Sequence, residues 1–317
     1  MNPISCGRWM GMVAGLLSLG GVAMAQGDPV ALPAEMMPAT AQNLLLDIAR
    51  AGHNTVAVGD RGAVLISADG QQWQQVPTPT RAALTAVSFA DRQHGWAVGH
   101  DAVILASQDG GQSWVQQHFD PDLEKPLLDV LALDSRHAIA IGAYGLMLRT
   151  EDGGQQWAEV QTPMSEEEWH FNAIARLADQ SLLIVGETGT LARSTDNGLS
   201  WQVLDSPYDS SLFGVLAHGA HGALIFGLRG NVFVSDDVAA GQWQAVDSGT
   251  VDSMFGGTRL DNGQAVLVGL NGSVLRIDGK AVHQRKTPAG SPLSSVLAVG
   301  GALMAVGNAG IQTLALP

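Results

Sequence analysis

Residues 96–114 read WAVGHDAVILASQDGGQSW, and this stretch decides the fold. It begins with an apolar run that ends at Gly99, passes through a short turn into a second apolar run, and closes with a tight turn from Ser107 to Trp114. Short apolar runs separated by glycine-rich turns are typical of β-strands in an antiparallel meander. The stretch therefore predicts a hairpin and a further strand that begins at the tryptophan.

The pattern occurs seven times along the chain, at intervals of 38 to 44 residues. The apolar runs VAVG, WAVG, AIAIG, LIVG, LIFG, VLVG and MAVG end at Gly59, Gly99, Gly142, Gly186, Gly227, Gly269 and Gly307. Each unit also has an earlier apolar strand, such as LTAVSF at 84–89, which makes four short strands per unit. Units of this length and strand number are typical of propeller blades. We expect an all-β fold, a seven-bladed β-propeller of four-stranded antiparallel blades.

The seventh unit stops at Pro317 and is one strand short. Residues from Val30 to Pro38 precede the first complete unit and have no other place in the repeat. We predict that this segment forms the outer strand of the last blade and closes the ring, because closure removes exposed strand edges.

The first residues have the features of a secretory signal. Arg8 precedes an apolar stretch from Trp9 to Met24, and the small residues Ala23 and Ala25 predict cleavage before Gln26. We expect a signal peptide at 1–25 and a single propeller domain at 26–317, in a periplasmic or secreted protein. An uncleaved membrane anchor is the alternative.

Composition excludes several classes of function. The chain has 30 acidic and 16 basic residues, a net charge of −14, and such a surface repels nucleic acid and anionic lipid. The single cysteine, Cys6, lies in the predicted signal peptide, so we expect no disulfide, cysteine-ligated metal or cysteine nucleophile in the mature protein. The histidines show no ligand spacing, and no glycine loop suits a nucleotide, so we expect no cofactor and no metal site.

The turn before the last strand of a unit carries a second repeated motif, Ser/Thr-x-Asp-x-Gly-x-Ser/Thr-Trp. It occurs at 107–114, at 150–157 with Gln156 as a departure, and at 194–201, with imperfect copies at 67–73 and 235–243. The carboxylate can accept backbone N–H groups across the turn, and the tryptophan can be buried between blades. We predict structural roles for Asp69, Trp73, Asp109, Trp114, Asp152, Trp157, Asp196, Trp201, Asp237 and Trp243.

This motif is known as the Asp box or BNR repeat. Combined with seven units, a signal peptide and the pattern from Trp96 to Trp114, it resembles the photosystem II stability and assembly factor family of Asp-box propellers, over roughly residues 40–317. The resemblance implies a non-enzymatic protein on the luminal or periplasmic side of a membrane, which helps a membrane protein complex to assemble. Photosynthetic members use an arginine-rich patch, whereas this chain is acidic. We therefore expect a bacterial member outside photosynthesis, with a membrane complex such as a transporter as its partner.

One face of the predicted propeller is the candidate binding surface. The turns after the second strands share this face with the connections between blades, and the Asp-box turns lie on the other. The turn residues differ in charge and size, which favours binding, although turn geometry alone is the alternative. Trp169 lies outside the repeat and beside acids, as in a protein-binding hot spot, or it packs its own loop. The candidates are Asp60, Arg61, His100, Asp101, Tyr144, Glu187, Arg229, Asn271, Asn308, Trp169 and His170.

A sialidase-like glycoside hydrolase is the alternative function. Such an enzyme needs three converging arginines, a tyrosine nucleophile with a glutamate partner, and a general acid. Tyr144 and Tyr208 are the tyrosines available, and the Arg-Ile-Pro-like run typical of sialidases is absent. We predict a non-catalytic exported scaffold. The arginines that the alternative would draw on are Arg61, Arg149, Arg193, Arg229 and Arg276.

Overall fold

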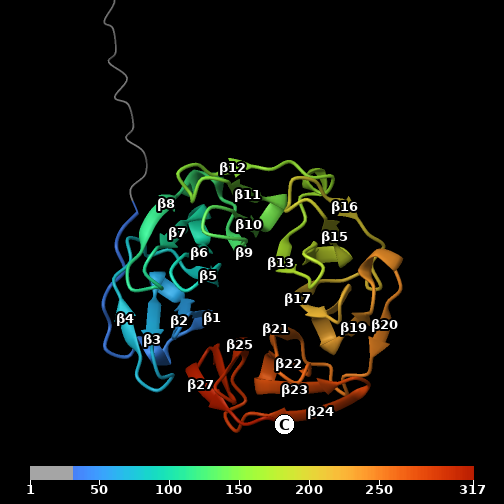
Figure 1. The fold of residues 1–317 in the computed structure, drawn as a ribbon. Helices are drawn as coiled ribbons and strands as arrows, with labels where there is room; N and C mark the ends of the chain where they lie inside the picture. The colour runs from blue at the N-terminus through green and yellow to red at the C-terminus, as the bar shows by residue number, and fades with distance from the viewer. Residues whose placement is uncertain (1–30) are drawn as a thin grey trace, which may run out of the picture.

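The computed structural model describes residues 31–317, which form a ring of seven antiparallel β-sheets around a central channel (Figure 1). Six sheets have four strands and the last has three. The seven-bladed propeller predicted from the repeat is confirmed. The predicted signal peptide, residues 1–25, lies outside the described residues.

The strands of each blade follow one another from the channel outward. Blade 1 consists of β1 (Leu45–Ala51), β2 (Asn54–Gly59), β3 (Val64–Ser67) and β4 (Gln74–Val76). Blade 2 consists of β5 (Leu84–Phe89), β6 (Gly95–Gly99), β7 (Ile104–Ser107) and β8 (Val115–His118). Blade 3 consists of β9 (Leu127–Ala132), β10 (Ala138–Gly142), β11 (Met147–Thr150) and β12 (Ala158–Glu159). Blades 4 to 7 are formed by β13 (Phe171–Arg176), β14 (Leu182–Gly186), β15 (Leu191–Ser194), β16 (Gln202–Val203); β17 (Leu212–His218), β18 (Gly222–Gly227), β19 (Val232–Ser235), β20 (Gln244–Val246); β21 (Met254–Arg259), β22 (Ala265–Gly269), β23 (Ser273–Asp278), β24 (Ala281–Lys286); β25 (Leu293–Val299), β26 (Ala302–Gly307) and β27 (Gly310–Leu314).

The core lies between neighbouring blades. Strands β6, β10, β14 and β22 are buried along their whole length, because each side of a blade packs against another blade. Val98 of β6 faces one neighbour, and Ala97 faces the other. This two-sided burial explains why the glycine-ended runs are continuously apolar and do not alternate with polar residues.

The Asp-box turns lie at the ends of the third strands. In blade 4 the carboxylate of Asp196 accepts the hydroxyl and the N–H of Ser200, and these bonds lower the pKa of Asp196 to about 2. In blade 2 the indole of Trp114 is 6% exposed and packs against Phe89 and against Val56 of blade 1. Each complete turn thus joins a hydrogen-bonded loop to an aromatic contact with the preceding blade.

The N-terminal segment does not form the predicted outer strand of blade 7. The N–H of Ala34 donates to the carbonyl of Thr78, and the N–H of Met37 donates to the side chain of Gln75, so the described part of this segment lies on blade 1. Pro33 and Pro38 have no N–H to donate, which prevents a continuous strand ladder at 30–38. The ring closes by side-chain packing of blade 1 against blade 7.

All helices within residues 31–317 are three-residue 3₁₀ turns, and none of them is long and apolar enough to cross a membrane. Four of these lie outside the turns that follow second strands: η1 (Thr40–Gln42), η4 (Pro121–Leu123), η6 (Ser165–Glu167) and η9 (Val238–Ala240).

Candidate binding face

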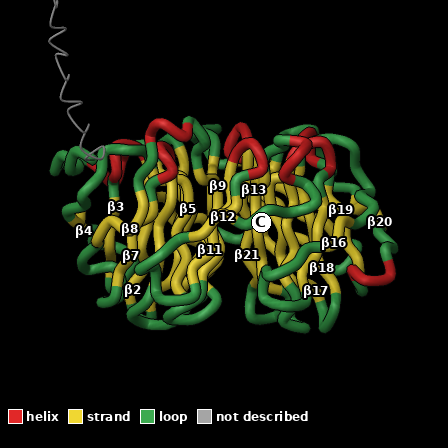
Figure 2. Tube along the Cα trace, turned by 90° about the horizontal axis from the view of Figure 1, so that it is seen from above, coloured by secondary structure: helices red, strands yellow, loops and turns green. Residues whose placement is uncertain are grey.

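Tight turns after the second strands line one face of the ring, which we call the turn face (Figure 2). Blade 7 has the two-residue turn at Asn308 and Ala309, and the other blades have a 3₁₀ turn. The connections between blades cross the same face, as shown by the bond from the N–H of Gly145 to the carbonyl of Trp169. The 3₁₀ turns are η2 (Asp60–Gly62), η3 (His100–Ala102), η5 (Ala143–Gly145), η7 (Glu187–Gly189), η8 (Leu228–Gly230) and η10 (Leu270–Gly272).

The middle residue of each of these six 3₁₀ turns has a left-handed backbone, with φ between 52° and 58°. This conformation costs residues with a Cβ about 1–2 kcal/mol, and only asparagine and aspartate adopt it readily. The six residues are Arg61, Asp101, Tyr144, Thr188, Arg229 and Asn271. Turn geometry alone explains Asp101 and Asn271, whereas the strained backbone at the other four positions points to a role for their side chains.

Four of the predicted site residues come together where blades 3 and 4 meet. The rings of Tyr144 and His170 make an edge-to-face contact at 4.9 Å, and Nδ1 of His170 lies 3.7 Å from Oε1 of Glu187. Tyr144 is 46% exposed and Trp169 is 38% exposed, so both present aromatic surface to solvent. We call Tyr144, Trp169, His170 and Glu187 the Tyr144 cluster.

The other predicted site residues are spread around the turn face. Asp60 and Arg61 form an exposed ion pair at 3.5 Å in blade 1. His100 and Asp101 in blade 2, Arg229 in blade 5 and Asn308 in blade 7 are also exposed. The structure therefore places these residues on one face but does not gather them at one site.

Asn271 takes part in a polar network that the sequence did not indicate. Its amide donates to Asp252 at 2.7 Å, and the ammonium of Lys286 lies 2.8 Å from the same carboxylate. Lys286, the hydroxyl of Ser273 and Asn271 together lower the pKa of Asp252 to about 2. This network fixes the connection between blades 5 and 6, and it occupies the side chain of Asn271.

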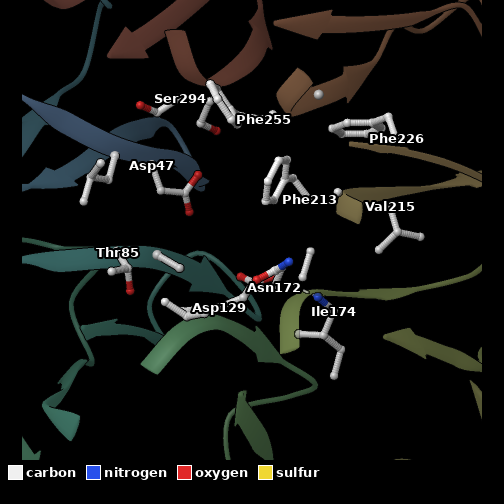
Figure 3. A pocket seen from close by; sticks show the side chains of 18 of the residues that line it. Asp47, Thr85, Asp129, Asn172, Ile174, Phe213, Val215, Phe226, Phe255 and Ser294 are labelled. Carbon is white, nitrogen blue, oxygen red and sulfur yellow. Dashed lines mark hydrogen bonds between the residues drawn. The ribbon is translucent and has the colours of Figure 1, made fainter. Parts of the chain in front are cut away.

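The inner strands of the blades surround a central hollow of about 200 Å³, which we call the channel (Figure 3). A β-bulge interrupts the innermost strand of every blade, and a bulge redirects the side chains around it. Phe213 and Phe255, with ring centroids 5.5 Å apart, line one part of the channel, and Asp47 and Asp129 line another. The bulged residues are Leu46, Thr85, Leu128, Asn172, Phe213, Phe255 and Ser294.

Asp47 and Asp129 are functional candidates that sequence reasoning missed. Asp129 accepts the N–H of Ile174 in the next blade at 2.8 Å, and Asp47 accepts the N–H of Val87 at 2.9 Å. Burial raises the pKa of Asp129 to about 7, with a further contribution from the charge of Asp47, and burial also raises the pKa of Asp47. No arginine, lysine or histidine is among the described residues that line the channel.

The arrangement does not assemble a sialidase site in the described part of the chain. Arg61 and Tyr144 are on the turn face, in blades 1 and 3. Arg149 and Arg193 lie in third strands beside the Asp-box turns, and they pair with Glu151 and Asp179. Within residues 31–317, no group of three or more His, Cys, Asp or Glu side chains is placed to hold a metal ion.

The strand topology, the Asp-box turns and the exposed turn face define a seven-bladed Asp-box propeller. The family model described as photosynthesis system II assembly factor YCF48 matches residues 65–126 and 116–284. The chain belongs to this family.

Two groups of relatives show the range of similarity. A 46-residue segment is 44% identical to the photosystem II assembly protein Ycf48 of Thermosynechococcus vestitus, and 58 residues are 40% identical to the chloroplastic photosystem II stability/assembly factor HCF136 of Cyanidioschyzon merolae. Those segments cover 14% and 18% of this chain, and 13% of each relative.

The solved structures are similar over most of the chain. A structure described as YCF48 bound to D1 peptide superposes with a TM-score of 0.71 at 20% identity, and covers 91% of this chain and 100% of its own. YCF48 from Cyanidioschyzon merolae gives a TM-score of 0.67 at 19% identity, over 89% of this chain and 98% of its own. The propeller domain of Doa1 gives 0.70 at 12% identity, over 90% and 95%. These likenesses establish the fold.

Proposed function

We propose that this protein is a non-catalytic assembly factor that binds a membrane protein through its turn face, with the Tyr144 cluster as the main contact. Family membership supports an assembly role, since relatives are named as photosystem II assembly factors and one solved relative is described as bound to a D1 peptide. We further propose that the protein is exported and works on the periplasmic or luminal side of the membrane.

The observation that carries the proposal is an exposed tyrosine in a strained turn, with an exposed tryptophan on the neighbouring connection. Tyr144 keeps a left-handed backbone at φ 54° and still presents 46% of its surface to solvent. Trp169 lies beside it on the connection that enters blade 4, next to three glutamates. Tyrosine and tryptophan are enriched among the residues that dominate binding energy, because a rigid ring buries much area at small entropic cost.

Charge indicates what kind of segment the turn face would bind. The chain carries a net charge of −14, and Glu187 with Glu166, Glu167 and Glu168 makes the surroundings of the Tyr144 cluster acidic. A basic segment of the partner would be steered to such a surface and held beside the aromatic rings.

The test is recovery of membrane proteins with the tagged protein from membranes in mild detergent. A double variant, Tyr144→Ala with Trp169→Ala, should lose the integral membrane proteins that the unchanged protein retains. The matched control is Leu199→Ala, since Leu199 is 62% exposed on an Asp-box turn at the opposite face. Equal recovery with the double variant would show that the Tyr144 cluster is not the binding site.

A further inference from the structure

The outer edge of blade 7 is open in the part of the chain that the structure describes. Ile311 of β27 pairs with Val306 of β26, just as Met147 pairs with Ile141 in blade 3. In blade 3 the carbonyl of Met147 accepts the N–H of Val160 from the outer segment, but no described residue makes the equivalent backbone bond to Ile311. Alternation in an antiparallel ladder directs the N–H and C=O groups of Ile311 and Thr313 away from β26. Within residues 31–317, the outer edge of β27 is therefore unpaired.

A hollow lies between blades 6 and 7, near the residues that follow β27. In blade 2 the Asp-box turn and Trp114 fill the space against the preceding blade. Blade 7 has no such turn, and a hollow of about 490 Å³ lies between blades 6 and 7 instead. Its apolar lining comes from Leu260 of blade 6 and from Leu303 and Leu316 of blade 7. An apolar side chain of an added segment would have room here, beyond the end of β27 at Leu316.

Basic and donor groups lie beside β27, on the side of the strand that faces blade 6. Val266 of blade 6 packs against blade 7, and Arg276 and Arg285 lie on that side of the blade 6 sheet. The Nε of Arg276 and the amide nitrogen of Gln312 are buried, and neither has a hydrogen-bond acceptor within residues 31–317. Arg285 donates to the carbonyl of Ala315, just after β27. A bound segment with carboxylates would neutralise the two arginines and accept hydrogen bonds from both buried donors.

The described N-terminal segment does not supply this occupant. Ala34 and Met37 are hydrogen-bonded to blade 1, and Glu35 faces Arg81 at 3.3 Å. The segment at 31–38 has the sequence ALPAEMMP, with one acidic residue and two prolines. A different chain is the better source of an acidic strand.

We propose that the open edge of β27 binds an extended acidic segment of a partner protein. The segment adds as an antiparallel fourth strand, in the mode of β-strand addition. Its backbone pairs with Ile311 and Thr313, and one carboxylate points toward Gln312 and Arg276. This docking site is separate from the turn face and does not depend on the function proposed above.

The chain itself contains a suitable probe sequence. Residues 155–162, QQWAEVQT, end the Asp box of blade 3 and include β12. Glu159 pairs with Leu148 of β11. Leu148 and Gln312 hold equivalent positions in blades 3 and 7, because each of them pairs with the residue two before the anchor glycine of its blade. A peptide of this sequence would therefore place its glutamate opposite Gln312.

The experiment measures binding of the fluorescein-labelled QQWAEVQT peptide to the full protein by fluorescence anisotropy. We expect saturable binding that is weakened about tenfold by Glu159→Gln in the peptide, since a charge-assisted hydrogen bond contributes more than a neutral one. Thr313→Pro in the protein should weaken binding about fivefold, because it removes an outward N–H and leaves the pairing with β26 intact. Leu199→Ala, on an Asp-box turn, should leave binding unchanged.

Several results would overturn the proposal. No binding at about 1 mM peptide would do so, and so would equal affinity for the glutamate and glutamine peptides or for the Thr313→Pro variant. A dimer in sedimentation equilibrium that Thr313→Pro abolishes would assign the edge to a second copy. Binding that appears only after residues 1–38 are removed would assign it to the protein's own N-terminal segment.

Discussion

Replacing Asp129 with asparagine should change how the stability of this protein depends on pH. Burial raises the pKa of Asp129 in the channel from 3.8 to about 7, so the folded state holds a proton that the unfolded state releases above pH 4. The free energy of unfolding therefore falls as pH rises from about 4 to about 7, by at most about 1.4 kcal/mol per pH unit. The whole shift corresponds to an upper bound of about 4 kcal/mol.

Other titrating groups can be separated from this effect. Asp196 and Asp252 have pKa values of about 2, so the stability they contribute is lost only below about pH 4. Burial lowers the pKa of His118, which makes stability rise with pH and partly opposes the effect of Asp129. These contributions cancel when the free energy of unfolding of the Asp129→Asn variant is subtracted from that of the unchanged protein at each pH, since both proteins share them.

The assay is urea unfolding at intervals between pH 4 and pH 8, with Asp122→Asn as a control at an exposed acid. Asparagine is neutral at every pH, so the Asp129→Asn variant should have a distinctly flatter profile between pH 4 and pH 7. Asp122→Asn should follow the unchanged protein. Parallel profiles for the unchanged protein and Asp129→Asn would refute the claim that Asp129 is protonated in the folded state.

Three further predictions concern packing, strain and the polar network. Trp114→Ala should lower the free energy of unfolding by about 3–5 kcal/mol in urea melts, because the indole is 6% exposed, whereas Trp169→Ala should cost less than about 1 kcal/mol; similar losses would contradict the packing account. Tyr144→Gly should leave stability unchanged or raise it by up to about 1 kcal/mol, as it relieves a left-handed backbone, while recovery of membrane proteins falls; a clear loss of stability would argue against strain. Asp252→Ala should lower the free energy of unfolding by about 2 kcal/mol, because it leaves the buried hydroxyl of Ser273 and the amide of Asn271 without their acceptor, and Asp252→Asn, which keeps an acceptor oxygen, should lose less; equal losses would show that these hydrogen bonds do not stabilise the fold.

The repeat was sufficient to predict the ring. Glycines 40 or so residues apart, from Gly59 to Gly307, mark the end of each second strand, and the blades at the two ends of the chain are adjacent as expected. The continuously apolar runs predict strands that are buried on both sides, and in the structure these strands pack between two neighbouring blades. The outer strand of blade 7 predicted at residues 30–38 is not formed by residues 31–38, where Pro33 and Pro38 lack an N–H for the ladder; Val30 lies outside the described residues.

The channel could not be predicted. Asp47 and Asp129 stand in apolar runs, and the side to which each points depends on the bulges at Leu46 and Leu128. A bulge adds one residue to one strand and shifts the alternation after it, and no turn or glycine marks its place in these runs. The Tyr144 cluster was predicted in part: its residues were assigned to one face, but the contact between Tyr144 and His170 depends on how blades 3 and 4 pack.

Site-specific photo-crosslinking tests the central claim, that the turn face binds a membrane protein, most directly. A photoreactive phenylalanine analogue would replace Tyr144 in one protein and Leu199, on the opposite face, in another, and each would be irradiated with intact membranes. The account predicts a discrete crosslink from position 144 to an integral membrane protein, and none to that protein from position 199. Equal crosslinking from both positions, or none from position 144, would contradict it.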